Sequence, residues 1–482
     1  MTKIETLSEI YKFHNKKDYL IAKNKYKNFI QKNQTSSEAY YLLGMLYQEF
    51  EKNLPKALSN LTKAINYNPK NYEAYLSRGN IYATEGKFKE CIYDYTEALK
   101  INNGYSIPYN NRGKIYADLG EYEKAISDFS NAISIDINFA AAYLGRANSK
   151  AKIQEFEGAI KDYISAISKK KNNYDAFFGL SIIFLLLGNY KEGFKLYESR
   201  WNLNQIPYDP PDKNKKIWLG EEDLNGKKIL IRHEQGLGDT IQFSRYVEKF
   251  KNFNCEVFLE VQKPLVNFIS TIGENIKVFQ SGSFKENYDY HCPIMSLPLA
   301  FKTTKETIPS KNRYLKCDPI KITKWSKILG KKSKPRIGLA WSGSKDNPLD
   351  KFRSIKLEHF AQSLNEKYEW ISLHKEYRDN EKTQLSNFGI KDFSDYQLDF
   401  SETAAQIENL DLIISVDTSI AHCAGAIGKK TIILISYSPD WRWLLNTNKS
   451  PWYPSVELIR LQRRQKWQDV FLKLIKQIDN YF

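Results

Sequence analysis

Residues that would build a metal centre or a disulfide framework are scarce in this sequence. Five cysteines are spread over 482 residues, namely Cys91, Cys255, Cys292, Cys317 and Cys423. Their spacings match neither the short Cys–Cys intervals of zinc sites nor the paired cysteines of small secreted domains. Widely separated thiols are typical of a reducing compartment, so the sequence predicts a cytoplasmic location.

Long hydrophobic runs are also missing. The longest, Ile182–Leu187, is far shorter than the roughly 20 residues that a membrane-spanning helix needs. The first residues, Met1–Thr6, are polar and lack the apolar segment of a secretory leader. We therefore expect no integral membrane segment.

Dense clusters of one charge are rare as well. The net charge is +16, but the basic excess is distributed over both halves of the chain, and its densest run is Arg460–Lys466. Such a distribution is typical of solvated surfaces with a general attraction for anionic ligands, and we expect no nucleic acid partner. The remaining composition, 42% hydrophobic residues with 32 tyrosines, is that of a globular chain long enough for two or three domains.

A period of 34 residues organises the first two hundred positions. Small residues recur at this interval, and aromatic and alanine positions follow them at fixed spacings, beginning at Gly79, Gly113, Ala147 and Ser181. The pattern resembles the tetratricopeptide repeat, a helix–turn–helix unit, and predicts an all-α solenoid over residues 1–201. The concave face of such a solenoid usually binds a protein or peptide. A spacer or a dimerisation surface, which would make the protein a homo-oligomer, is the alternative.

The last repeat departs from this pattern. Arg200 stands where the preceding units have alanine, and Trp201 follows it. We therefore expect this unit to pack against the next domain. Residues 202–225 contain three prolines and show no clear period, which is typical of an ordered connector.

A strand expected at Lys228–Arg232 leads into a turn that contains two glycines. Gly236 and Gly238 allow the backbone to approach a ligand closely, and Asp239 stands at the start of the following helix. Many strand-to-helix turns have such glycines, so Asp239 as a simple helix cap is the alternative. The alternation of strands and helices predicts a Rossmann-like domain over residues 226–332.

A second Rossmann-like domain is expected over residues 333–482. In its stretch Leu410–Gly428, a buried strand ends at an Asp-Thr-Ser sequence, and small residues then open a helix. A phosphate would bind where this helix begins, at Asp417, Thr418, Ser419 and His422. The same residue types are also ordinary helix caps. The last helix, Trp467–Ile478, is expected to cross back to the first Rossmann-like domain.

Five motifs resemble, in order, those of bacterial tetratricopeptide-repeat proteins with a C-terminal heptosyltransferase-like domain of the glycosyltransferase family 9 type. They are Glu234–Tyr246, Gly338–Gly343 with Arg353–Ile355, Leu410–Gly428, Pro439–Trp443 and Ser450–Pro454. The resemblance covers nearly the whole chain. It implies the glycosyltransferase B fold, in which the first α/β domain binds the acceptor and the second the nucleotide-sugar donor. It also implies an inverting reaction without metal or cofactor. The architecture is also similar to that of the O-linked N-acetylglucosamine transferases.

The resemblance further implies roles for individual residues. Asp239 matches the aspartate proposed as the general base, which takes the proton of the acceptor hydroxyl while the anomeric carbon is attacked. The donor diphosphate is expected at Gly236, Gly238, Asp417, Thr418, Ser419 and His422. Arg353 is the candidate cation at the phosphates, with Lys351 nearby. The loop before Arg353 departs from the family pattern, which leaves Asn347 and Asp350 without an assignment.

Several other side chains are candidates for ligand contacts. His374 and Glu376 follow a strand end that is expected to border the base or ribose, and an ordinary loop role is equally open. Trp441 is a candidate for stacking on a sugar or base, with buried packing as the alternative. His233 is a candidate on the acceptor side.

Taken together, these features predict a glycosyltransferase that moves a sugar from a nucleotide-sugar donor to an acceptor, for which a protein held by the repeats is the candidate. One alternative is transfer to lipopolysaccharide or another surface glycan, with the repeats used for assembly. Another is a non-catalytic scaffold. The sequence does not specify the sugar, the base or the acceptor.

Overall fold

The computed structural model describes residues 6–203, 212, 214–345, 350–361, 364–378, 380–463 and 465–482. The chain divides into two compact units, Met1–Gly179 and Leu180–Phe482. None of the described helices is long and apolar enough to cross a membrane. The expected domain boundaries at residues 201, 225 and 332 stay predictions.

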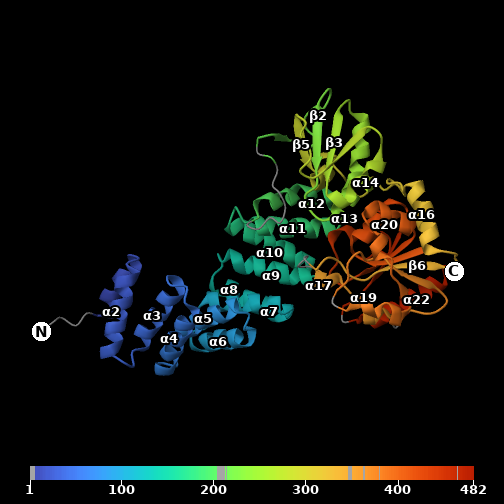
Figure 1. The fold of residues 1–482 in the computed structure, drawn as a ribbon. Coiled ribbons are helices and arrows are strands. Elements are labelled where there is room, and N and C mark those ends of the chain that lie inside the picture. The colour runs from blue at the N-terminus through green and yellow to red at the C-terminus, as the bar shows by residue number, and fades with distance from the viewer. Residues whose placement is uncertain are drawn as a thin grey trace. The chain divides into compact units, whose positions relative to one another are not determined.

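Paired helices make up the first unit (Figure 1). Their bounds are α1 (Leu7–Asn15), α2 (Tyr19–Lys32), α3 (Ser37–Glu49), α4 (Leu54–Tyr67), α5 (Tyr72–Thr84), α6 (Phe88–Ile101), α7 (Ser106–Asp118), α8 (Tyr122–Ile135), α9 (Ala140–Lys152), α10 (Phe156–Lys169) and α11 (Tyr174–Leu186), the last of which continues into the second unit. The pairs α5 with α6, α7 with α8 and α9 with α10 follow the 34-residue period, and the pair α3 with α4 fits it with one inserted residue. The expected all-α repeat solenoid is therefore confirmed.

The small residues of the period lie where the two helices of a repeat are closest. A Cβ atom added to Gly79 would lie 2.9 Å from the ring of Tyr95, and one added to Gly113 would lie 3.0 Å from the ring of Phe129. Because these distances are shorter than ordinary van der Waals contacts, a larger residue would push the helices of a repeat apart.

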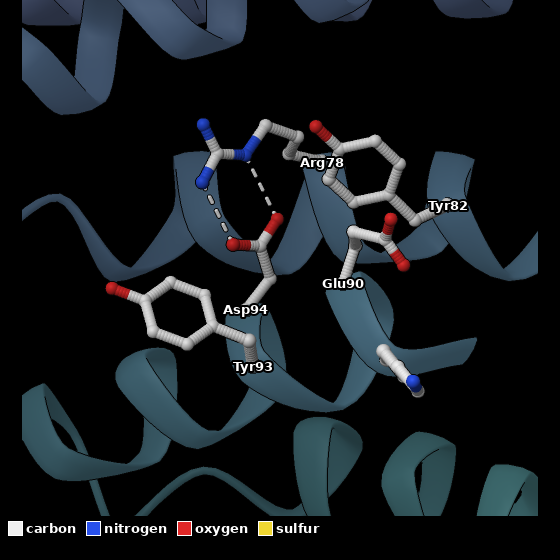
Figure 2. Close-up of a pocket in the computed structure, with 6 residues that line it drawn as sticks. Arg78, Tyr82, Glu90, Tyr93 and Asp94 are labelled. Atoms are coloured by element: carbon white, nitrogen blue, oxygen red, sulfur yellow. Dashed lines mark hydrogen bonds and ion pairs between the residues drawn. The ribbon is translucent and has the colours of Figure 1, made fainter. Parts of the chain in front are cut away.

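Partly buried arginines join successive repeats. Arg78 donates from Nε and Nη2 to the two carboxylate oxygens of Asp94, both at 2.8 Å, and from Nη1 to Thr62 of the preceding repeat at 3.2 Å. Figure 2 shows this pair. Arg78 and Asp94 also line a hollow of about 330 Å³. The same three bonds recur at Arg112 with Asp128 and Thr96, and at Arg146 with Asp162 and Ser130. We call Arg78, Arg112 and Arg146 with these acceptors the arginine ladder.

Two parallel sheets form the core of the second unit. The first has the order β1-β5-β2-β3-β4, and the second has the order β11-β10-β9-β6-β7-β8. Their strands are β1 (Lys216–Ile217), β2 (Lys228–Arg232), β3 (Glu256–Val261), β4 (Ile276–Gln280), β5 (Tyr290–Pro293), β6 (Arg336–Ala340), β7 (Glu369–Ser372), β8 (Ile390–Lys391), β9 (Leu412–Val416), β10 (Thr431–Ile435) and β11 (Val456–Arg460). The strands β6, β9 and β10 are buried along their whole length, as expected for parallel strands covered on both faces.

Helices connect the strands of both sheets (Figure 1). The α-helices are α12 (Tyr190–Tyr197), α13 (Leu237–Ser244), α14 (Val266–Ile269), α15 (Leu297–Ala300), α16 (Pro319–Leu329), α17 (Asp350–Arg353), α18 (Leu357–Ala361), α19 (Glu381–Gln384), α20 (Phe400–Glu408), α21 (Ser419–Ala426) and α22 (Trp467–Asp479). The 3-10 helices are η1 (Glu198–Asn202), η2 (Arg245–Asn252), η3 (Lys263–Leu265), η4 (Ser270–Ile272), η5 (Ile294–Ser296), η6 (Ser386–Phe388), η7 (Ser394–Tyr396) and η8 (Trp441–Trp443).

The expected crossing of the last helix is wrong. Val470, Phe471, Leu474 and Ile478 of α22 belong to the hydrophobic core of the second sheet, where they are buried with Ile337 and Leu412. This apolar side of α22 is satisfied by the sheet of its own domain, so the helix has no reason to reach the first sheet. Contacts between the two α/β halves are made instead by α13 with α21, by α16 with α20 and by α14 with α20.

Part of the expected connector belongs to the first sheet. Lys216 and Ile217 of β1 pair in parallel with Tyr290 and His291 of β5, and Trp218 is buried. The three prolines of the connector, Pro207, Pro210 and Pro211, lie outside the described residues.

The strand order places three turns at positions favoured for ligands. In the first sheet the chain runs from β2 outward to β3 and β4, and then returns to β5 on the other side of β2. In the second sheet it runs from β6 to β7 and β8, and then returns to β9 on the other side of β6. Ligands of open parallel sheets bind beyond the carboxyl ends of strands at such reversals. The turns that follow β2, β6 and β9 are therefore the candidate region.

Candidate functional site

The turns after β2 and β9 come together in the second unit. The helices that begin there, α13 and α21, pack against each other. A Cβ atom added to Gly238 would lie 2.6 Å from Cδ2 of His422 and 3.4 Å from Cα of Ser419. Gly238 is thus required for the close approach of the two helix starts, and the group that it approaches is protein. The partial positive charges of both N-termini lie side by side, which favours an anion there.

Asp239 occupies the first turn of α13. Its Oδ2 accepts a 2.9 Å hydrogen bond from the backbone N–H of Gly236, the N-cap residue, and its Oδ1 accepts from the guanidinium of Arg442. A fifth of the side chain is exposed. Burial raises the pKa of Asp239, Arg442 opposes this rise, and Asp440 adds to it. Asp239 therefore caps its helix and also carries a carboxylate with a raised pKa at the meeting point of the two turns.

Arg442 is a site residue that the sequence interpretation missed. It lies in η8, beyond β10, and pairs with Asp440 at 2.8 Å as well as with Asp239. Its guanidinium carbon is 4.5 Å from the centre of the Trp441 ring and 5.6 Å from that of Phe243. The signal was present in the sequence, because Arg442 belongs to the motif Pro439–Trp443 that contributes to the family resemblance.

Asp417 follows β9 and is the second carboxylate of the site. Burial raises its pKa to about 6, Asp440 adds to this, and Arg353 opposes it. Its Oδ1 lies 3.8 Å from Nε2 of His422. His422 is buried, and its Nδ1 is 2.9 Å from the hydroxyl of Tyr453. Burial lowers the pKa of His422, and Arg442 adds to this effect, so the imidazole is neutral at neutral pH.

Thr418 and Ser419 form the start of α21. Thr418 is the N-cap residue, yet among the described residues its side chain makes no capping bond to the helix, and its Oγ1 lies 3.2 Å from Oγ of Ser415. The capping alternative for the Asp-Thr-Ser sequence is therefore not what the structure describes. The first N–H groups of α21 are left without a side-chain cap and can bind an anion.

Arg353 reaches the same region from α17. Its charge lowers the pKa of Asp417 and of Asp239 and also that of His422, and its Nε is 3.5 Å from Oδ1 of Asp350. Asn347 and the side chain of Lys351 lie outside the described residues.

Asp350 and Arg378 hold the turn after β6. Asp350 accepts from the backbone N–H of Gly343 at 3.0 Å and pairs with Arg378. Arg378 in turn donates to the carbonyl of Gly343 at 2.9 Å. Asp350 and Arg378 thus have a role in fixing this turn, and Arg378 was not anticipated from the sequence.

Three predicted ligand contacts receive less support. Nε2 of His374 accepts a 3.0 Å bond from the backbone N–H of Trp341, and the two rings lie 4.0 Å apart. Burial lowers the pKa of His374 to about 3, so this histidine is neutral and fixes the end of β6. Glu376 is exposed. A ribose contact for either residue stays a prediction.

For Trp441 the structure favours the alternative of buried packing over stacking on a sugar. Its side chain is buried, and its ring lies within 6.5 Å of the rings of Tyr190, Phe194, Tyr197, Phe243 and Trp452. Each of these ring pairs is close enough for an aromatic contact. Trp441 therefore belongs to an aromatic core, whereas the next residue, Arg442, lies at the site and pairs with Asp239.

Comparisons with known proteins agree with this organisation. The tetratricopeptide repeat family matches residues 37–71, 72–105 and 107–139, and glycosyltransferase family 9 (heptosyltransferase) matches residues 396–474. The chain thus contains tetratricopeptide repeats and a glycosyltransferase family 9 domain. The matched segment holds Asp417, His422 and Arg442, whereas Asp239 and Arg353 lie outside it.

Protein FlbA of Caulobacter vibrioides is 27% identical over 320 residues, which are 60% of this chain and 52% of FlbA. The chain therefore spans about half the length of this relative. Among solved structures, YrrB, a TPR protein with an unusual peptide-binding site, matches with a TM-score of 0.34 and 17% identity, over 36% of this chain and 89% of YrrB. MamA matches with a TM-score of 0.32 and 24% identity, over 35% of this chain and 96% of MamA.

Proposed function

We propose that the chain is a glycosyltransferase of the glycosyltransferase B type that uses a nucleotide-sugar donor, inverts the anomeric centre and needs no metal. The observation that carries the proposal is a pair of arginines, each with a buried Nε atom that donates no hydrogen bond to the described residues. Among the described residues, the Nε atoms of Arg353 and Arg442 are buried and have no hydrogen-bond partner. Buried polar groups of native proteins are nearly always paired, so a ligand that brings acceptors to this place is expected.

The donor diphosphate fits the start of α21. The uncapped N–H groups there, the N-terminus of α13 beside them, and the charges of Arg353 and Arg442 form an electropositive set. These groups stabilise the negative charge that builds on the nucleoside diphosphate as the glycosidic bond breaks. The match of residues 396–474 to glycosyltransferase family 9 supports this assignment of the donor side. Among the described residues no group of three or more His, Cys, Asp or Glu side chains could hold a metal ion, and metal independence stays part of the proposal.

Asp239 is the proposed general base. It takes the proton of the acceptor hydroxyl while that oxygen bonds to the anomeric carbon from the face opposite the leaving diphosphate, and the electron pair of the glycosidic bond leaves with the nucleotide. A carboxylate of raised pKa is a stronger base than an ordinary aspartate. Arg442 must release Asp239 for this step, and the donor phosphates offer Arg442 an alternative acceptor.

The acceptor is proposed to be a protein or peptide that the repeats recruit. The support is the confirmed repeat solenoid, an architecture whose concave face usually binds such partners. Deletion of Met1–Gly179, which ends at the boundary of the compact unit, should lower transfer to a protein acceptor and leave donor hydrolysis intact. Unchanged transfer to the protein acceptor would favour a surface glycan as acceptor.

A panel of nucleotide sugars tests the enzymatic proposal. The native chain should hydrolyse at least one donor slowly and bind its nucleotide, and Asp239→Ala should abolish turnover while nucleotide binding persists. Absence of both turnover and binding for every nucleotide of the panel would leave the non-catalytic scaffold as the function. The metal requirement is checked in the same assay with a chelator, which should have no effect.

A further inference from the structure

Arg200 is the residue that breaks the alanine pattern of the repeats. It lies in η1, which directly follows α12. Its side chain is completely buried. The guanidinium lies between two aromatic rings, 4.8 Å from the centre of Tyr197 and 4.3 Å from that of Trp201. A charge without any exposed surface is costly unless every donor is satisfied.

All three side-chain nitrogens of Arg200 have acceptors. Nε and Nη2 donate to the two oxygens of Glu234 at 2.8 and 3.1 Å. Nη2 also donates to Oγ of Ser296 at 2.7 Å, and Nη1 donates to Glu198 at 2.6 Å and to the carbonyl of Tyr197 at 3.2 Å. The planar guanidinium therefore fixes the position and the orientation of the Glu234 carboxylate.

Glu234 and its neighbour Gln235 begin the turn that leads to Asp239. Glu234, itself buried, also accepts from the backbone N–H of Met295 at 2.8 Å. The amide of Gln235 donates to the hydroxyl of Tyr197 at 3.0 Å, and its carbonyl accepts from Gln262 at 2.9 Å. Two consecutive residues of the turn are thus held by Tyr197 and Arg200. Gly236 follows directly, and its N–H is bonded to Asp239.

We propose that Arg200 is a positioning residue, which acts through Glu234 to hold the turn Glu234–Asp239 so that the Asp239 carboxylate faces Arg442 and the start of α21. The inference rests on the proposed function in one respect, since it takes Asp239 to be the general base. The segment η1, which follows the helices of the repeats, is then part of the catalytic unit. This accounts for the replacement of the repeat alanine by a buried arginine, because a buried ion pair contributes little to stability compared with an apolar pair of similar size.

The test compares two matched double variants of the full chain. Arg200→Met with Glu234→Gln removes the buried charges and keeps a side-chain oxygen that can accept from Met295. Arg112→Met with Asp128→Asn makes the same change in the arginine ladder. Both are measured for donor hydrolysis, nucleotide affinity, the pH dependence of hydrolysis, and amide hydrogen exchange over residues 235–240.

The first double variant should lower kcat of hydrolysis about 100-fold, the scale expected when a reacting group is misplaced by about 1 Å. Nucleotide affinity should change much less than kcat, because most groups proposed to bind the diphosphate, namely the start of α21, Arg353 and Arg442, belong to the half of the second sheet. The acidic limb of the pH profile should move to higher pH, since Asp239 loses the Arg442 charge that lowers its pKa. Amides 235–240 should exchange faster. The ladder variant should change none of these.

Native-like kcat and exchange in the first double variant, or equal losses in the ladder variant, would overturn the proposal. If the double variant does not fold, Arg200→Lys serves instead, since lysine keeps the charge but cannot bond both oxygens of Glu234 in the plane of a guanidinium. It should lower kcat about tenfold and speed exchange over residues 235–240, and an unchanged value of both would overturn the proposal. A native chain without turnover or nucleotide binding would remove the proposed function, whereas the exchange measurement would still decide whether Arg200 holds the turn.

Discussion

The arginines of the ladder and those of the site differ in how completely they are paired. Arg78, Arg112 and Arg146 each use Nε, Nη1 and Nη2 on acceptors of their own or the preceding repeat. Arg353 and Arg442 also lie near carboxylates, yet among the described residues each has a buried Nε that donates no hydrogen bond, although that of Arg353 lies 3.5 Å from Oδ1 of Asp350. A fully paired arginine holds protein segments together, and an incompletely paired one is available to a ligand.

Their carboxylates differ in the same way. Asp94, Asp128 and Asp162 each face the arginine of their own repeat. At the site, Asp239, Asp417 and Asp440 share the charges of Arg353 and Arg442, and burial raises the pKa of both Asp239 and Asp417. Burial also raises the pKa of Asp94 in the ladder, so the difference lies in the sharing of cations. Perturbed carboxylates gathered with cations are more common at functional sites than in structural pairs. The comparison predicts that equivalent substitutions reduce activity at the site and stability in the ladder.

The largest effect is expected for Asp239→Asn. The amide keeps the size of the side chain and can still accept from Gly236, but it cannot take a proton. Hydrolysis and transfer should fall by about 10²- to 10⁴-fold in kcat, with nucleotide affinity nearly unchanged. Asp128→Asn is the control in the ladder and should keep native kcat. Equal losses of activity in both variants would show that the two classes of carboxylate do not differ in function.

Arg442→Gln should have the next largest effect. Loss of the charge weakens the stabilisation of the leaving diphosphate and should lower kcat/KM for the donor by about 10- to 100-fold. It also removes the group that lowers the pKa of Asp239, so the acidic limb of the pH profile should move to higher pH. Steady-state kinetics between pH 5 and 8 measure both. A lower kcat/KM with an unmoved limb would mean that Arg442 does not act on Asp239.

In the ladder, Arg112→Met is expected to act on stability alone. Asp128 is almost fully buried beside it, and a buried carboxylate without its partner should lower the free energy of unfolding of the first unit by about 2 kcal/mol. Denaturant titration of the native and variant chains measures this change. Donor hydrolysis should stay native, and a loss of turnover at concentrations of denaturant that leave both units folded would contradict the structural role.

The repeats could be predicted from the sequence in more detail than the site. Each helix pair of the solenoid packs mainly on its neighbours in the chain, so the spacing of Gly79, Gly113 and their aromatic partners carries the fold directly. The two α/β halves were also visible as strands that alternate with helices, and the turns at Asp239 and Asp417 followed from the rule that ligands bind beyond strand ends.

The remaining site residues depend on contacts between distant segments. Arg442 meets Asp239 although more than two hundred positions separate them in the sequence, and no local pattern encodes that pairing. The docking of α22 was misjudged for the same reason, because an apolar face does not specify which of two available cores it joins. The sequence left the burial of Trp441 open, and its ring contacts with Phe243 decide it.

Asp417→Asn should give the smallest effect. It should raise the free energy of unfolding, whereas Arg112→Met in the ladder should lower it. The pKa of Asp417 in the folded chain is about 6, above the value of about 3.9 for an unfolded chain. The folded state therefore binds this proton more tightly, and stability decreases as the pH rises from about 4 to 6, beyond which the full cost of ionising Asp417 is present. Removing the carboxyl removes that cost, so at pH 8 the variant should be more stable than the native chain by about 1 to 2 kcal/mol. Near pH 4 the difference should vanish. Thermal unfolding of the second unit at both pH values measures it, and a pH-independent difference would contradict the raised pKa.

Because Asp440 helps to raise that pKa, Asp440→Asn in the native background should weaken the same pH dependence. A site that becomes more stable when its carboxylate is removed is one in which the carboxylate is retained for a purpose other than folding, which is the property that separates Asp417 from Asp128.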